Sequence, residues 1–308
     1  MKIIYKLLFL FLLTIGYSSC DFLDIVPDEI TTEADAFKDR NAAKNFVYSC
    51  YGYLPQSNVA SGSLDLLTGD EVITAFEHET FASFPKGNYT ASSPVISYWN
   101  TFFQGLRQCY IFLENVDKVP DLTESVKTDY IAQVKFLIAY YHYQLARCYG
   151  PIILIKELPD VNASQAEYLP RTSYDECVDW ICNLLDEAAS SLPAIRTNKE
   201  DYGLATSVGA KAVKAKMLLY AASPLFNGNS SFYSNFTDKS GSQLMPLTYD
   251  PNKWVKAKTA IKEAIDLAEQ NGHALYVKQD YKIGNEDANP YPAAGPVRCL
   301  RTSLVDWD

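Results

Sequence analysis

Residues 134–155 read VKFLIAYYHYQLARCYGPIILI, an aromatic-rich segment interrupted by a Gly-Pro pair. Apolar or aromatic side chains recur around it in steps of three or four, which places them on one face of an α-helix. The residues at this spacing are Tyr130, Val134, Leu137, Tyr141, Leu145 and Cys148. The same face is widened by Tyr140, Tyr143 and Ala146. A helix that is apolar over most of its circumference must lie between other helices. Gly150 and Pro151 end this helix, and a short, apolar, strand-like tail follows.

The same periodicity predicts an all-α fold with long irregular loops. Helices are expected over 34–54, 99–116, 126–149, 174–192, 203–225 and 254–270. Taken in order, they form three pairs, which is typical of a tetratricopeptide-like array of helix hairpins. The spacing between the pairs is irregular, so the symmetry of the sequence alone does not establish a repeat. In the fifth helix, the side predicted to be buried consists of Val208, Ala212, Ala215, Leu219 and Ala222.

The first 19 residues are predicted to be an export signal rather than part of the fold. Lys2 and Lys6 precede a nine-residue apolar run that is too short to span a bilayer, and small residues lead to Cys20. This pattern favours a lipoprotein signal peptide, in which the lipidated Cys20 anchors residues 20–308 to a membrane. A plain cleaved signal peptide is the alternative.

The charge balance argues against nucleic acid as a partner. The whole chain carries a formal charge of -10, and removal of residues 1–19, which contain two lysines and no acidic residue, moves it to -12. An acidic chain without a basic run or a basic amphipathic stretch is not expected to bind nucleic acid. The 22 tyrosines and 15 phenylalanines are mostly expected in the core, although such richness also suits stacking on sugar rings.

Four segments carry a resemblance to a known family. They read FLIAYYHYQLARCYGPIILI at 136–155, RTSY at 171–174 in a helix that ends AASSLP, AKAVKAKMLLYAASPLFNGN at 210–229, and WVKAKTAIKEAIDLA at 254–268. Together, and in this order, they resemble SusD/RagB proteins, the nutrient-binding outer-membrane lipoproteins. The resemblance covers nearly the whole chain after the signal, but only the N-terminal part of the family. It therefore implies a SusD-like N-terminal helical domain over 20–308 that is truncated at its C-terminus.

The resemblance also implies a function. SusD-like proteins capture a glycan, or in some members a peptide, and deliver it to a SusC-like, TonB-dependent transporter. The protein would then be held by a lipid anchor to the outer membrane and would face the cell exterior. Family members pack their helix pairs into a scaffold whose loops carry the ligand site. The segment before Trp99 is one that contributes ligand-binding aromatics in the family.

Candidate binding residues therefore lie in the aperiodic stretch 57–97, where aromatic side chains occur among polar and small ones. Loops of this length are usually functional or disordered, and the aromatics argue against disorder. The predicted ligand-binding residues are Asp70, Glu71, Phe76, Phe81 and Tyr89. The rings would stack on sugar faces, and the carboxylates, or Asn88, would orient hydroxyl groups. The alternative is that the rings only pin the loop to the helices beneath. Trp99 itself is expected in the core.

Residue patterns for catalysis, metals or cofactors are absent from the sequence. His78, His142 and His273 form no HExxH arrangement, and glycine-rich phosphate loops and G-x-S-x-G are missing. We therefore expect a binding protein without catalytic residues, metal or cofactor. Two alternatives stay open. Loop carboxylates such as Asp70 and Glu71 could serve a secreted helical glycan hydrolase, or the array could be a tetratricopeptide-like scaffold that binds only protein.

Overall fold

The structure, a computed structural model, describes residues 33–55, 76, 78, 80–160, 162 and 169–275. Several predictions fall elsewhere in the chain. The signal segment 1–19, the lipidation site Cys20, and the binding residues Asp70 and Glu71 lie outside the described residues.

The described residues confirm the all-α prediction. Their α-helices are α2 (Glu33–Ala36), α3 (Arg40–Tyr51), α5 (Trp99–Asn115), α6 (Glu124–Tyr149), α7 (Tyr174–Ser191), α8 (Ser207–Ala222), α9 (Ser230–Tyr233) and α10 (Asn252–Gln270). Short 3-10 turns occur at η3 (Thr80–Ser83), η4 (Val116–Lys118) and η6 (Lys199–Asp201). No strand is present in this part of the chain, and only two isolated β-bridges occur.

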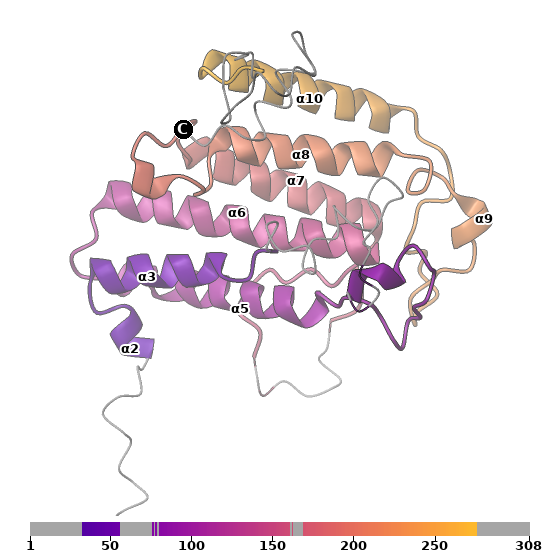
Figure 1. Cartoon of the computed structure of the whole chain (residues 1–308), viewed down its shortest axis with the longest axis horizontal. Coiled ribbons are helices and arrows are strands. Elements are labelled where there is room, and N and C mark those ends of the chain that lie inside the picture. Colours follow the sequence, from indigo (N-terminus) through magenta and orange to yellow (C-terminus); the bar gives the residue numbers. More distant parts are fainter. Residues whose placement is uncertain are drawn as a thin grey trace, which may run out of the picture.

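The long helices stack in chain order, as a hairpin array requires. The predicted pairs α3–α5, α6–α7 and α8–α10 are in contact, and α5–α6 and α7–α8 join one pair to the next. Figure 1 shows this stack running from α3 and α5 through α6, α7 and α8 to α10. Because neighbouring helices are antiparallel, the long segments 80–98 and 223–251 both lie at the end where α6 finishes and α7 begins (Figure 1). We call this the loop end.

The central helix α6 forms the core, as its apolar circumference predicts. Leu137, Tyr141 and Leu145 are fully buried. The hydroxyl of Tyr141 donates a hydrogen bond of 2.5 Å to the Cys50 carbonyl of α3. Gly105 of α5 lets the helices approach closely, because a Cβ there would lie 3.0 Å from the Tyr141 ring. The aromatic face thus joins α3, α5 and α6 into one packed unit.

The first predicted helix, 34–54, is interrupted. It is divided into α2 and α3, and Asp39 between them adopts an extended backbone. Its carboxylate accepts a hydrogen bond from the Ala42 N–H, 2.8 Å away. An aspartate at this position satisfies a free N–H of the following turn and so starts a new helix. Phe37, in the break, is still buried.

The predicted buried side of α8 is partly wrong. Ala215 and Ala222 are buried, but Ala212 is exposed and Leu219 is 42% exposed. Helix α8 contacts α10 through Ala215, which packs against Ala260 and Ala264. Small residues at this contact let two helices approach closely and leave the larger Leu219 on the surface.

The apolar tail after Pro151 is extended but pairs with no strand. Its backbone polar groups bond to other parts of the chain instead. The Ile152 carbonyl accepts from the Thr172 N–H at 2.7 Å, the Ile155 N–H donates to His142 Nε2 at 3.1 Å, and the Tyr110 hydroxyl donates to the Ile155 carbonyl at 2.6 Å. His142 Nδ1 faces the Ile138 carbonyl at 2.8 Å. The ring is completely buried and is therefore neutral. Because Nε2 accepts a hydrogen bond and Nδ1 faces a carbonyl, the proton is on Nδ1.

The buried His142 predicts acid sensitivity. Burial lowers its pKa from 6.5 to about 4, because a proton on Nε2 would face the Ile155 N–H in a dry site. Between these values the unfolded chain binds a proton that the folded chain does not, so stability is lost as the pH falls below 6.5. The titration of this single group should lower the free energy of unfolding by about 2 kcal/mol between pH 7 and pH 5. Urea unfolding at both pH values measures the loss.

The matched control for this prediction is His142→Gln, which has no titrating ring. Its loss of stability between pH 7 and pH 5 should be smaller by about 2 kcal/mol. Equal losses in the two proteins would show that His142 does not carry the acid sensitivity.

Candidate functional site

The first of the two long segments at the loop end, residues 80–98, is fixed where it enters α5. The Tyr98 N–H donates a hydrogen bond of 2.9 Å to the Tyr149 hydroxyl at the end of α6. The Trp99 ring meets Tyr149 edge-on at 5.2 Å, and the Arg171 guanidinium lies over the Trp99 ring at 5.5 Å. Trp99 is partly buried against the core. It is therefore a packing residue, as predicted, and its ring is already covered.

The second long segment, residues 223–251, is fixed to the start of α7. The buried Tyr174 ring stacks on Phe226 with centroids 4.8 Å apart. The Tyr174 N–H donates to the Leu244 carbonyl at 2.9 Å. Leu244 and Met245 are buried. Phe226, near the start of this segment, and Leu244, near its end, thus both contact Tyr174, the first residue of α7.

The two ends of the same segment are held together by Asn227. Its Nδ2 donates to the Asp250 carbonyl and its Oδ1 accepts from the Asp250 N–H, each at 2.9 Å. The next residue, Gly228, has a φ of +80°, and a Cβ there would lie 2.3 Å from the Tyr249 nitrogen. Only glycine allows this approach of two backbones. The segment between is therefore a closed, anchored loop.

Exposed aromatic rings project from these two anchored segments. Tyr89 of the first segment, a predicted ligand-binding residue, is 50% exposed. Phe76, also predicted, precedes that segment and is 63% exposed. Phe232 and Tyr249 of the second segment are 76% and 57% exposed. Phe81 lies in η3, and its side chain is outside the described residues. Exposed apolar rings that gather on one surface mark candidate interaction sites, so the loop end is the candidate binding surface.

Local contacts set the orientation of some of these rings. Tyr89 meets Phe84 edge-on at 5.4 Å, and Phe76 lies 5.7 Å from the His78 ring. Phe232 and Tyr249 were not among the predicted binding residues. Their segment mixes aromatics with Ser, Asn and Gly, as the 57–97 stretch does, and that shared composition was the available signal.

A hollow of about 390 Å³ lies beside the second segment, lined by Ser173 and Asp175 at the start of α7 and by residues 243–247. Asp175 is paired with Lys253 of α10 at 2.5 Å. The hollow combines apolar side chains with a few fixed polar groups, which is the usual character of small-ligand sites. It adds a concave surface to the exposed rings of the loop end.

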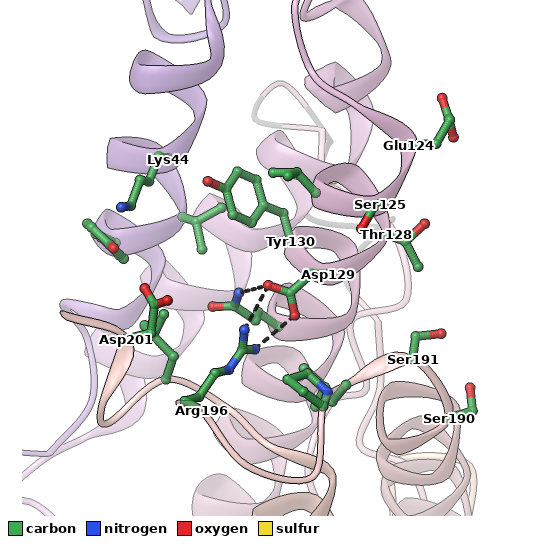
Figure 2. A pocket seen from close by; sticks show the side chains of 17 residues that line it. Lys44, Glu124, Ser125, Thr128, Asp129, Tyr130, Ser190, Ser191, Arg196 and Asp201 are labelled. Atoms are coloured by element: carbon green, nitrogen blue, oxygen red, sulfur yellow. Dashed lines mark hydrogen bonds and ion pairs between the residues drawn. The ribbon is translucent and has the colours of Figure 1, made fainter. Parts of the chain in front are cut away.

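A larger groove of about 780 Å³ occupies the opposite end of the array. Its walls are α3, the first turns of α6, the end of α7 and the chain between 192 and 204. We call it the Arg196 groove. Arg196 makes a two-pronged ion pair with Asp129, with Nη–Oδ distances of 2.9 and 2.8 Å (Figure 2).

The ion pair belongs to a closed ring of hydrogen bonds. Arg196 also donates to the Ala205 carbonyl at 2.8 Å, and the Ala205 N–H donates to the Tyr51 hydroxyl at 2.9 Å. Tyr51 donates to Gln133 Oε1 at 3.0 Å, and Gln133 Nε2 returns to Asp129 at 2.8 Å. Burial raises the pKa of Tyr51, so its hydroxyl remains a donor. The ring ties α3, α6 and the 192–206 connection together.

The described residues contain no candidate metal site, and none of their helices could span a membrane. No group of three or more His, Cys, Asp or Glu side chains in this part of the chain could hold a metal ion. None of its helices has the length and apolarity needed to cross a bilayer.

Comparison with known proteins agrees with the fold. A model of SusD-like proteins, described as starch-binding and associating with the outer membrane, matches residues 21–219. A curated relative, SusD-like protein P25 of Formosa agariphila, is 23% identical over 230 residues, which is 70% of this chain and 43% of that protein.

Solved structures extend this comparison. The structure of BT4246 is 36% identical, with a TM-score of 0.72 over 79% of this chain and 42% of that chain. Surface glycan-binding protein A from Bacteroides uniformis has a TM-score of 0.52 at 17% identity, over 81% of this chain and 49% of its own, a likeness of fold alone. The chain spans less than half the length of each of these proteins.

Proposed function

This chain belongs to the SusD-like family, whose members associate with the outer membrane, and on that premise we propose that it binds a glycan at its loop end. The observation that carries the proposal is the set of exposed rings on two anchored segments, Tyr89, Phe232 and Tyr249. Aromatic faces stack on the C–H faces of sugars, and anchored loops lose little entropy when a ligand binds. The description of the matching family model, starch-binding, supports the same ligand class.

The proposal includes a place in the cell. The protein would be lipidated at Cys20, face the cell exterior, and deliver its glycan to a SusC-like, TonB-dependent transporter. The sequence pattern of residues 1–20 and the family's association with the outer membrane support this arrangement. A peptide nutrient is the second ligand class that the resemblance allows.

Removal of the exposed rings should weaken glycan binding. Phe232→Ala and Tyr249→Ala are each expected to raise the Kd at least tenfold, because each removes about 1.4 kcal/mol of stacking. Isothermal titration against starch, laminarin, xylan and yeast mannan would identify the ligand with the wild type and then measure the variants. Phe232 and Tyr249 are exposed, so these variants should fold normally.

The matched control is Tyr202→Ala, which removes an equally exposed tyrosine at the opposite end of the array. Its affinity should equal that of the wild type. Wild-type affinity in both loop-end variants would place the glycan elsewhere.

Two other functions remain as alternatives. A glycan hydrolase would release shorter products from the polysaccharide that it binds, whereas the proposed binding protein would leave the polymer intact after prolonged incubation. A protein-binding scaffold would bind none of the four polysaccharides. Chromatography of the incubated glycan therefore separates the enzyme from the binding protein, and the titration separates the scaffold from both.

A further inference from the structure

We propose that the Arg196 groove is a second carbohydrate site, which takes a short uncharged oligosaccharide at the end of the array opposite the loop end. The groove is built from different helices than the loop end, so the inference goes beyond the proposed function. Its volume of about 780 Å³ falls within the range of small-molecule sites, roughly 300–1,000 Å³.

The charges of the groove favour a neutral ligand. Its lining contains the cations Lys44 and Arg196 and the carboxylates Glu124, Asp129 and Asp201. Arg196 and Asp129 neutralise each other through their ion pair. Glu124 pairs with Lys127 at 2.8 Å, so the charges that remain in the lining are Lys44 and Asp201, one of each sign. An uncharged ligand with many hydroxyl groups suits both signs.

The floor of the groove presents fixed polar groups. The side chains of Asp129 and Arg196 are 27% and 12% exposed, so their outer edges can be reached while the hydrogen-bond ring holds their positions. Preset polar groups bind hydroxyls with little loss of conformational entropy. Figure 2 shows Lys44 and Asp201 on one side of this pair and the hydroxyl-bearing Ser125, Thr128, Ser190 and Ser191 on the other.

The wall formed by α3 and α6 adds aromatic surface. Tyr48 is 37% exposed and Tyr130 is half-buried. The Lys44 ammonium lies 5.5 Å from the centre of the Tyr48 ring, and its contact with the Tyr48 hydroxyl raises the pKa of Lys44. A charged hydrogen-bond donor therefore stands beside a phenol ring. Apolar ring surface next to fixed donors and acceptors is the combination that a sugar requires.

The test uses the Phe232→Ala/Tyr249→Ala protein as its background, so that binding at the loop end is already weakened. Saturation-transfer NMR would be recorded with maltotriose, cellotriose, xylotriose and mannotriose, and with trigalacturonic acid as the charged probe. At least one neutral trisaccharide should bind, and the acid should not. Adding Tyr48→Ala should weaken that binding at least tenfold, whereas Tyr202→Ala, a nearby exposed tyrosine outside the groove lining, should leave it unchanged.

The outcomes separate the two sites. If the wild type binds polysaccharide but the background binds no trisaccharide, the groove proposal is overturned and the loop end stands. Equal binding in the Tyr48→Ala and Tyr202→Ala proteins, or preference for the acid, would also overturn it. If the groove binds a trisaccharide while the loop-end variants keep wild-type affinity for polysaccharide, the groove stands and the loop-end proposal fails.

Discussion

Replacement of Arg196 by methionine is expected to lower the free energy of unfolding by about 3 kcal/mol. The substitution opens the hydrogen-bond ring: Asp129 keeps only its bond from Gln133, and the Ala205 carbonyl loses its donor. A largely buried carboxylate without its cation is costly, although the 27% exposure of Asp129 limits the loss to the lower part of the usual 3–5 kcal/mol range. Urea unfolding measures the change.

Lys135→Met is the matched control for this prediction. It removes an ion pair with Glu187 in which both side chains are well exposed, so it should cost about 0.5 kcal/mol or less. Arg196→Lys should fall between the two, because lysine keeps the charge but cannot make the two-pronged contact. An Arg196→Met protein as stable as Lys135→Met would show that the ring does not hold the helices together.

Gly228→Ala should have the second large effect, a loss of about 3 kcal/mol. The new methyl group would sit 2.3 Å from the Tyr249 nitrogen and 2.6 Å from the Thr248 carbonyl carbon, both of them backbone atoms. The clash separates the two ends of the second segment and breaks the Asn227–Asp250 hydrogen bonds. We therefore expect faster proteolysis within 229–248 and weaker glycan binding, in addition to the lower stability.

Gly203→Ala separates this clash from simple backbone strain. Gly203 also has a positive φ, +91°, but a Cβ there would meet no atom within 4 Å. The Gly203→Ala substitution should lower the free energy of unfolding by only about 1 kcal/mol. Similar losses in the two proteins would mean that the close approach at Gly228 does not anchor the loop.

The helices and their pairing could be predicted because they depend on local periodicity. The aromatic face of 134–149 predicted a central helix, and Tyr141 and Leu145 are indeed fully buried within it. The resemblance to SusD/RagB proteins, which the family match confirms, added the assembly of the pairs into one array. The irregular spacing of the pairs could not provide this.

The errors arose where one side chain or a pair of small residues decides the geometry. Asp39 divides the first helix because its carboxylate caps a new one, and the hydrophobic pattern continues across this break. In α8, several faces contain apolar residues. The Ala215–Ala260 contact selects one of them, and periodicity alone cannot show which face meets a neighbour.

The candidate sites were only partly predictable. Aromatics in a long aperiodic segment led to Tyr89, whose exposed ring lies at the loop end, and to Phe76, which is exposed but precedes that segment. A binding role for these two residues, as for Asp70 and Glu71, stays a prediction. The hydrogen-bond ring of the Arg196 groove joins Tyr51, Asp129, Gln133, Arg196 and Ala205. These residues are far apart in the chain and of ordinary types, so their meeting depends on how the helices pack.

The most direct test of the central claim, a glycan site at the loop end, is hydrogen exchange followed by mass spectrometry. The protein would be compared with and without saturating amounts of the polysaccharide found by titration. We predict slower amide exchange in 80–98 and 223–251, because bound glycan would stabilise both segments. Confirmed binding with unchanged exchange in both segments would contradict the account.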